Sequence, residues 1–93
     1  MKQRILKVHP KDNVLVALQN LEKGETLTYN GESFILQDAI GAKHKFFTTD
    51  LATGDDVIMY GVLVGKAQVP VQKGSLMNTG NVKHAAEPFA YRG

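Results

Sequence analysis

The chain has 93 residues, a length that corresponds to a single domain. Its 43% hydrophobic and 22% charged residues are ordinary globular proportions, which excludes a disordered or fibrous protein. The net charge of +2 arises from eleven basic and nine acidic residues spread along the chain, without the basic stripe that marks a nucleic-acid surface.

The absence of cysteine removes disulfides, thiolate metal sites and cysteine nucleophiles from consideration. The apolar runs are too short for a membrane span. The first thirteen residues, MKQRILKVHPKDN, lack the apolar region and the cleavage site of a signal peptide. We therefore expect a cytoplasmic protein with neither a membrane nor a nucleic acid as partner.

The first predicted elements are a short strand over residues 5–9 and one or two helical turns over 14–18. The strand is expected to end at Pro10, which cannot donate to a strand ladder. Asp12 and Asn13 are suitable caps for the helix, and the apolar residues that follow them have helical spacing. Two β-branched valines in the same segment suit a strand as well.

Asn30-Gly31 is the strongest hairpin signal in the chain, because both residue types tolerate positive φ and β-forming runs flank them at 26–29 and 33–36. Further strands are predicted over residues 45–49, 57–60, 62–64 and 68–71. Gly61 lies between two of these and indicates a bend, with a bulge or a close backbone approach. The expected fold is compact, antiparallel and mostly β, with little helix.

One glycine-containing turn pattern occurs three times, over residues 21–27, 51–57 and 71–77. Each copy has an apolar residue, two turn-tolerant residues, a glycine, two mainly polar residues and an apolar residue. This recurrence predicts that the chain uses the same turn three times.

Histidine is the first residue type to consider for chemistry, because it titrates near neutrality and is the commonest metal ligand. His9, His44 and His84 are far apart and lack metal-ligand spacing, so no metal site is expected in this chain. His44, beside Lys45, is either a solvated loop residue or an anion-facing group at a carboxylate pocket.

No other motif supplies an active site. The acidic pair Asp55-Asp56 follows a turn glycine and is typical of a solvated turn. The glycines of segment 61–65 lack the GK[ST] ending and the following helix of a phosphate loop. No catalytic residue is therefore predicted from the spacing of the residues.

Two stretches of the chain resemble the N-terminal SAF domain of the altronate and galactarate dehydratases. Residues 7–18, KVHPKDNVLVAL, resemble the start of that domain. Residues 43–67 resemble a family pattern of G-H-K and then D-I-x-x-G-x-x-V-x-K-Y-G-x-x-I-G-x-A. The resemblance covers nearly the whole chain and implies a small β-clip fold, with a SAF-like domain over residues 1–84 and a tail or linker over 85–93.

The resemblance also implies a function. The complete enzyme would be a sugar-acid dehydratase, a lyase of hexuronate catabolism that removes water from D-altronate to give 2-dehydro-3-deoxy-D-gluconate. It would use a divalent metal, iron or manganese, that this chain does not hold itself. The expected partner is a larger catalytic domain, in the same or a separate chain, and a homo-oligomer stays open. Alone, this chain is expected to be inactive and to help substrate binding or active-site closure.

Four residues are the substrate-binding candidates that the resemblance implies: His44, Lys45, Asn81 and His84. Many family members end the domain with V-H-x-H-N, which corresponds to residues 77–81 here. Asn81 matches that pattern, but Asn78 and Gly80 replace the two histidines, and His84 is expected to substitute for them in part. The alternative function is a non-catalytic carbohydrate-binding module or an assembly and oligomerisation module.

Overall fold

The computed structural model describes residues 3–84, so the predicted tail over 85–93 lies outside the described residues. Eight strands follow one another: β1 (Ile5–Leu6), β2 (Val14–Ala17), β3 (Thr26–Tyr29), β4 (Glu32–Ile35), β5 (Lys45–Phe47), β6 (Asp56–Met59), β7 (Val62–Ala67) and β8 (Val82–His84). Within residues 3–84 the chain forms no helix, and hence none that could cross a membrane. The predicted small, mostly β fold is confirmed.

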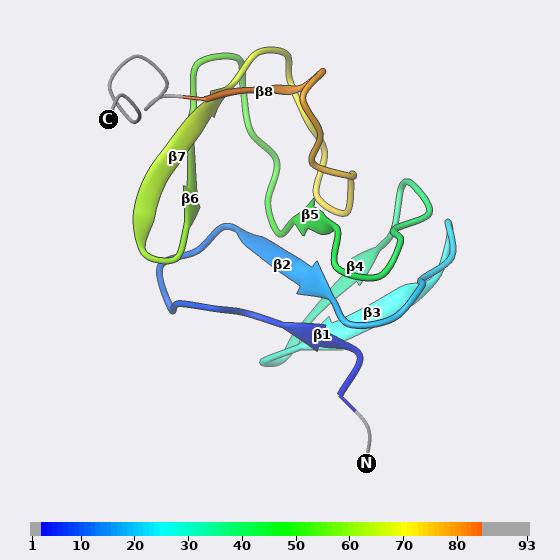
Figure 1. Ribbon diagram of the computed structural model, residues 1–93. Helices are drawn as coiled ribbons and strands as arrows, with labels where there is room; N and C mark the ends of the chain where they lie inside the picture. Colours follow the sequence, from blue (N-terminus) through cyan, green and yellow to red (C-terminus); the bar gives the residue numbers. More distant parts are fainter. Residues whose placement is uncertain (1–2, 85–93) are drawn as a thin grey trace.

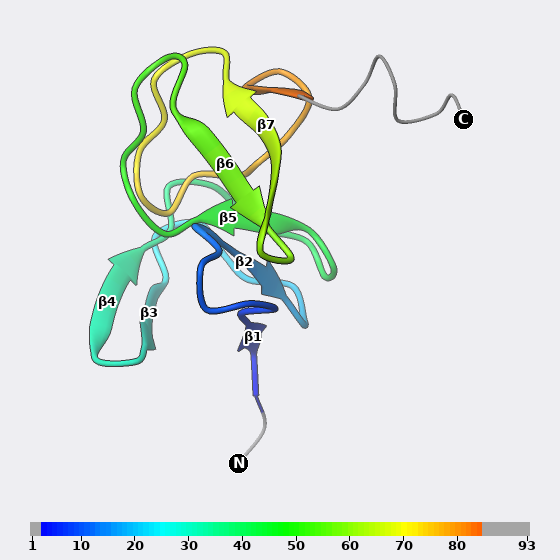
Figure 2. The same cartoon turned by 90° about the vertical axis from the view of Figure 1, so that its left-hand side faces the viewer.

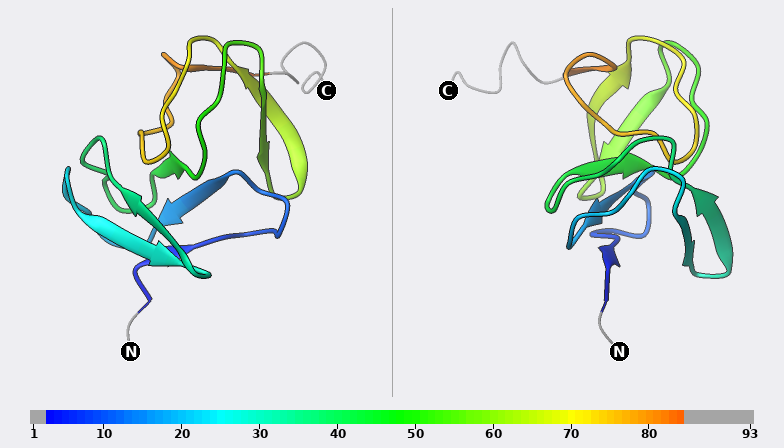
Figure 3. Two further views of the ribbon diagram at one scale, coloured as in Figure 1. Left: turned by 180° about the vertical axis from the view of Figure 1, so that it is seen from behind. Right: turned by 90° about the vertical axis from the view of Figure 1, so that its right-hand side faces the viewer.

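The strands form three antiparallel sheets, ordered β1-β2-β5, β3-β4 and β6-β7-β8. The β3-β4 hairpin and the β6-β7-β8 sheet lie at opposite ends of the molecule, with β2 and β5 between them (Figure 1). The quarter-turn view shows the same separation (Figure 2). From behind and from the other side, β1 and β8 also lie at opposite ends (Figure 3).

The prediction of a helix over residues 14–18 is wrong, because residues Val14–Ala17 form β2, the central strand of its sheet. Both faces of β2 are buried: Leu15 and Ala17 contact one apolar core, and Val14 contacts a second. A strand that is apolar on both faces loses the period-two alternation by which a half-buried strand is detected. Its apolar spacing was therefore open to a helical interpretation.

Asp12, predicted as a helix cap, instead holds a loop against the second hairpin. Its side chain is only 4% exposed. One carboxylate oxygen accepts the backbone N–H of His9 at 3.0 Å and of Tyr60 at 3.1 Å, and the other accepts the N–H of Gly61 at 2.9 Å. Hydrogen bonds to a charged acceptor are stronger than neutral ones, so this contact fixes the loop to the hairpin.

Asn13 completes the same connection. Its Oδ1 accepts the N–H of Ile58 at 2.9 Å, and its Nδ2 donates to the Asp56 carbonyl at 2.9 Å. The chain already turns at this point, where the Asp12 N–H donates to the His9 carbonyl at 3.0 Å. β1 ends at Leu6, before the Pro10 boundary predicted for it.

The hairpin predicted at Asn30-Gly31 is confirmed, with φ of 53° and 85° at these two residues. A second hairpin turns at Tyr60-Gly61, with φ of 59° and 75°, so the strand predicted to bend at Gly61 reverses direction there. The predicted close approach at Gly61 is present, because a Cβ atom there would lie 2.8 Å from Cδ2 of His9. The bulge lies instead further along the β6-β7 pair, at a register shift beside Ile58.

Two other predicted strands are shorter than expected. The strand predicted over residues 45–49 ends at Phe47. Of the strand predicted over 68–71, only Val71 pairs, in an isolated bridge with Leu51. β8 was not predicted as a strand.

The three predicted glycine turns share one geometry. The left-handed residues are Gly24, Gly54 and Gly74, with φ of 85°, 92° and 91°. In each turn, the N–H after the glycine donates to the carbonyl three residues earlier, at 3.0–3.1 Å. The glycine N–H and the carbonyl of the residue after it both bond to the backbone of one residue in another segment. This residue is Leu36 for the first turn, Ala67 for the second and Phe47 for the third.

A fourth turn of this kind was not predicted, because a lysine takes the glycine position. Lys43 has φ of 74°, and the His44 N–H donates to the Gly41 carbonyl at 3.0 Å. The Lys43 N–H and the His44 carbonyl both bond to Ala17, at 2.7 and 2.8 Å. We call all four the left-handed turns.

The left-handed turns divide the chain into two structural repeats, residues 21–47 and 51–77. Each repeat consists of a left-handed turn, a hairpin and a second left-handed turn. The apolar residues that begin the two turns pair with each other, Leu21 with Ile40 in the first repeat and Leu51 with Val71 in the second.

Each repeat has its own apolar core. The first core contains Ile5, Leu15, Ala17, Leu21, Leu27, Phe34, Leu36, Ile40 and Phe46. The second contains Val14, Phe47, Val57, Met59, Val71 and Val82. Adjacent Phe46 and Phe47 of β5 enter different cores, so β5 joins the two repeats just as β2 does.

Two matched substitutions test the left-handed turns. A Cβ atom at Gly54 would meet no atom within 4 Å, whereas one at Gly74 would overlap the carbonyl oxygen of Ile35. We expect Gly54→Ala to lower the free energy of unfolding by about 1 kcal/mol through backbone strain alone. Gly74→Ala should lower it by a further ~1–3 kcal/mol through overpacking. Urea unfolding of both variants measures this, and equal losses would contradict the structure.

Candidate functional site

Two lysines, Lys43 and Lys45, flank His44 where the second left-handed turn enters β5. We call these three residues the cationic turn. Lys43 and His44 are exposed, and Lys45 is half-buried. The Asn20 side chain accepts the N–H of Ala42 at 2.9 Å, which adds to the two bonds with Ala17. The turn is therefore held firmly at the end of β2.

Lys43 is unusual because a side chain occupies a left-handed backbone position. The three equivalent turns have glycine there, which adopts positive φ without steric strain. A lysine in this conformation costs about 1–2 kcal/mol. Since its side chain is exposed, packing within the domain does not offset this cost. Such an outlier points to a functional use of the side chain.

The cationic turn has no ionic partner within residues 3–84. The ion pairs in this part of the chain are Arg4–Glu25 and Lys66–Asp56. The positive charge of the turn is thus available to an anion from outside the domain.

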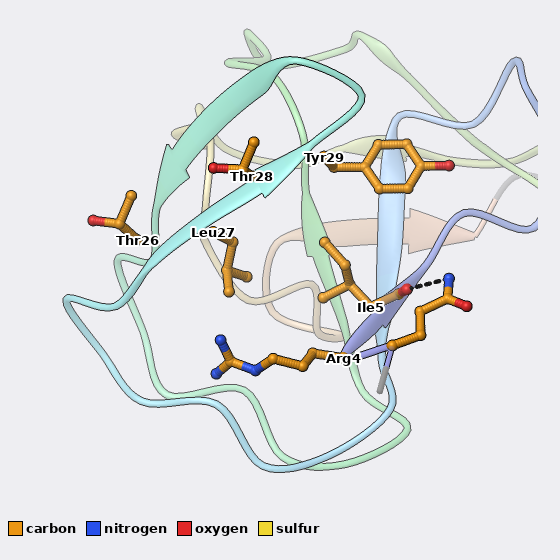
Figure 4. Close-up of a pocket in the computed structure, with 7 residues that line it drawn as sticks. Arg4, Ile5, Thr26, Leu27, Thr28 and Tyr29 are labelled. Atoms are coloured by element: carbon orange, nitrogen blue, oxygen red, sulfur yellow. Dashed lines mark hydrogen bonds between the residues drawn. The ribbon is translucent and has the colours of Figure 1, made fainter. Parts of the chain in front are cut away.

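A shallow hollow of about 300 Å³ lies between β1 and β3, lined by Gln3, Arg4, Ile5, Thr26, Leu27, Thr28 and Tyr29 (Figure 4). Ile5 and Leu27, both buried, belong to the first core. Glu25 pairs with Arg4 and neutralises its charge. The Gln3 amide donates to the Ile5 carbonyl at 2.8 Å. The hollow therefore offers mainly amide and hydroxyl groups to a ligand.

The hollow and the cationic turn flank the same end of β2. The Leu18 N–H donates to the Arg4 carbonyl at 2.8 Å, and the adjacent Ala17 bonds to Lys43 and His44. Arg4 thus lies on one side of this strand end and the cationic turn on the other. The two features form the candidate functional end of the molecule.

Asn81 is engaged within its own loop. Its Oδ1 accepts the N–H of Asn78 at 2.9 Å, and its Nδ2 donates to the Leu76 carbonyl at 2.8 Å. Asn78 in turn accepts the N–H of Gly80 at 2.8 Å. The loop starts beside β5, where the Met77 N–H donates to the Lys45 carbonyl at 2.9 Å. Asn81 thereby shapes the loop next to the cationic turn.

His84 belongs to a different sheet from the cationic turn. Its backbone ends β8 and pairs with Gly65 of β7, while its side chain lies outside what the structure describes. His9 packs its ring against Gly61, and its Nδ1 accepts the N–H of Lys11 at 3.1 Å. Over residues 3–84, no three metal-binding side chains gather in one place.

The sequence reasoning missed two residues with unusual conformations, Lys43 and Tyr60. A signal for both exists in the spacing of the two repeats. Tyr60-Gly61 lies thirty positions after Asn30-Gly31, and Lys43 stands where the second repeat has Gly74. Aligning the chain with itself would have placed both residues at positions of positive φ.

Comparison with known proteins connects this geometry to a family. A family model described as the altronate/galactarate dehydratase SAF domain matches residues 3–85. The chain is 33% identical over 78 residues to the altronate dehydratase of Escherichia coli (strain K12), and equally so to that of Bacillus subtilis (strain 168). Each match covers 84% of this chain but only 16% of the relative.

Replacing the strained lysine by glycine should stabilise the domain. We expect Lys43→Gly to raise the free energy of unfolding by about 1 kcal/mol, which raises the Tm by several degrees. The control is Lys23→Gly, at an exposed position of ordinary φ in an equivalent turn, which should lower stability by about 0.5–1 kcal/mol. Thermal unfolding of both variants is the measurement. A Tm for Lys43→Gly at or below that of the wild type would contradict the strain.

Proposed function

The chain belongs to the altronate/galactarate dehydratase SAF domain family, and on that premise we propose that it is the N-terminal module of a sugar-acid dehydratase. The complete enzyme would remove water from D-altronate to give 2-dehydro-3-deoxy-D-gluconate. The observation that carries the proposal is the match of 84% of this chain to altronate dehydratases, of which it covers only 16%. The much longer remainder of such an enzyme would form its catalytic region.

The proposal assigns catalysis to that region rather than to this module. Dehydration of a sugar acid requires a base, an acid for the departing hydroxyl, and stabilisation of developing charge. His44 is exposed, and His9 is engaged by Lys11 and Gly61, so neither is supported by a neighbouring carboxylate in the manner of a catalytic pair. We propose that the catalytic region also holds the divalent metal, iron or manganese, for which residues 3–84 offer no ligand cluster.

The module alone should therefore show no dehydratase activity. The purified 93-residue chain, assayed with D-altronate and iron or manganese, is expected to give no more product than a control without protein. The same assay on the complete dehydratase should give turnover. Product formation by the chain alone would contradict this division of roles.

The cationic turn gives the module a direct role in substrate binding or active-site closure. A sugar acid carries a carboxylate, and charge-assisted hydrogen bonds from cationic donors to a carboxylate are roughly twice as strong as neutral ones. His44 and Lys45 provide such donors on a turn whose backbone is fixed by Ala17. We propose that they meet the substrate carboxylate, or order the loop that covers it, once the catalytic region is present.

In the complete enzyme, His44→Ala and Lys45→Ala should each lower kcat/KM for D-altronate about tenfold, the loss of one charge-assisted contact of ~1.4 kcal/mol. The control is Lys66→Ala, which removes an exposed lysine of the second repeat that pairs with Asp56. It should leave kcat/KM unchanged. Wild-type kinetics in both test variants, with the domain folded, would contradict the proposed role.

A carbohydrate-binding module without a catalytic role is the second candidate function. The hollow beside β1 favours it, because Gln3 and Tyr29 flank an apolar floor in the way that small-molecule sites combine a few polar groups with apolar ones. Titration of the isolated chain with D-altronate, followed by NMR, separates the two. Saturable shifts confined to the hollow would favour this second function over the first.

A further inference from the structure

The tip of the β6-β7 hairpin carries three exposed apolar side chains. Tyr60 is 58% exposed, Val62 57% and Leu63 41%. We call these three residues the apolar tip. Monomeric soluble domains tolerate single exposed apolar residues, but a cluster at a protruding tip is typical of a surface that another molecule covers.

The first repeat provides an internal control for this tip. The equivalent residues of the β3-β4 hairpin are Asn30, Glu32 and Ser33, all polar. The same hairpin at the same position in its repeat therefore folds with an ordinary solvated tip. The turn geometry does not require the apolar residues of the second repeat.

The backbone of the apolar tip is strained and held firmly. Tyr60 adopts φ of 59°, a conformation that asparagine tolerates and a bulky aromatic residue rarely adopts. Buried Asp12 accepts the N–H groups of both Tyr60 and Gly61, and the His9 ring packs on Gly61. This arrangement fixes the backbone that carries the tyrosine, so less backbone entropy is lost when a partner binds the tip.

A register shift lies next to the apolar tip in β7. Val57 pairs with Gly65 but Ile58 pairs with Leu63, so Val64 is an extra residue in β7. Such a bulge changes the alternation of side chains along a strand. Val62 and Leu63 lie on the tip side of this bulge and are both exposed, as Glu32 and Ser33 are in the first repeat, where β3 and β4 pair without a shift.

We propose that the apolar tip docks against the catalytic region of the dehydratase, an inference that rests on the proposed function. An aromatic anchor with aliphatic neighbours is the usual centre of a protein interface. The match covers only 16% of each relative, so an N-terminal module has a large body to contact. β8, the last described strand, pairs with β7 at Gly65 to Ala67, so the link to a following region would begin beside the strand that carries Val62 and Leu63.

Hydroxyl-radical footprinting of the complete dehydratase tests the docking directly. Tyr60 should be oxidised about tenfold more slowly in the complete enzyme than in the 93-residue chain, because an interface core excludes water. Tyr29 in the hollow serves as the reference tyrosine. Equal oxidation of Tyr60 in both samples would overturn the proposal, even if the His44 and Lys45 variants lose turnover as the proposed function requires.

A variant that carries the tip residues of the first repeat at the equivalent positions of the second repeat tests the same proposal. The triple substitution Tyr60→Asn, Val62→Glu and Leu63→Ser places an Asn-Gly pair at a turn that favours it, so the isolated chain should keep or raise its Tm. In the complete enzyme, limited proteolysis should release the domain about tenfold faster. The control Ile35→Glu, at a side chain 58% exposed in the first repeat, should not change that rate.

Two outcomes for this triple variant would overturn the docking proposal. One is an unchanged rate of proteolytic release in the complete enzyme. The other is sedimentation of the wild-type chain as a dimer that the triple substitution converts to a monomer, which would make the apolar tip a contact between two copies of this chain.

Discussion

The left-handed turn is the constraint on which the rest of this structure depends. In each of its four copies, one residue at positive φ directs its N–H, and the carbonyl of the next residue, to a single residue of a distant segment. The two hydrogen bonds fix where the following segment starts and which segment it lies beside. Four such turns determine the paths of strands that are only two to six residues long. Strands this short gain little stability from their own pairing.

β2 and β5 contribute to both apolar cores, and each strand anchors one of the left-handed turns. Each of these strands directs some side chains into the first core and others into the second, and each accepts a left-handed turn at Ala17 or Phe47. The two repeats are therefore not independent units. A change in β5 that disturbs Phe46 or Phe47 disturbs both cores, since both rings are fully buried.

Differences between the two repeats separate the requirements of the fold from those of function. Where the repeats agree, as at Gly24 and Gly54, the backbone conformation explains the residue. Where they differ, a strained side chain is exposed: Lys43 replaces a turn glycine, and Tyr60 replaces a turn asparagine. We propose a use for each departure: the cationic turn for an acidic substrate and the apolar tip for the rest of the enzyme.

Local signals let the sequence determine part of this structure by itself. Asn30-Gly31 predicts its hairpin because both residues tolerate positive φ, and the glycine turns are detected for the same reason. The sequence also places the consecutive basic residues His44 and Lys45 together, and its resemblance indicates the family.

Features that depend on distant partners follow from the way the chain folds in three dimensions. β2 is a strand because both of its faces are buried in apolar cores. Asp12 holds its loop in place because its carboxylate accepts the N–H groups of Tyr60 and Gly61, 48 and 49 positions away. Likewise, the side-chain amide of Asn81 forms hydrogen bonds within its own loop. Such outcomes depend on which segments meet in the folded core, and local propensity contains no information about that.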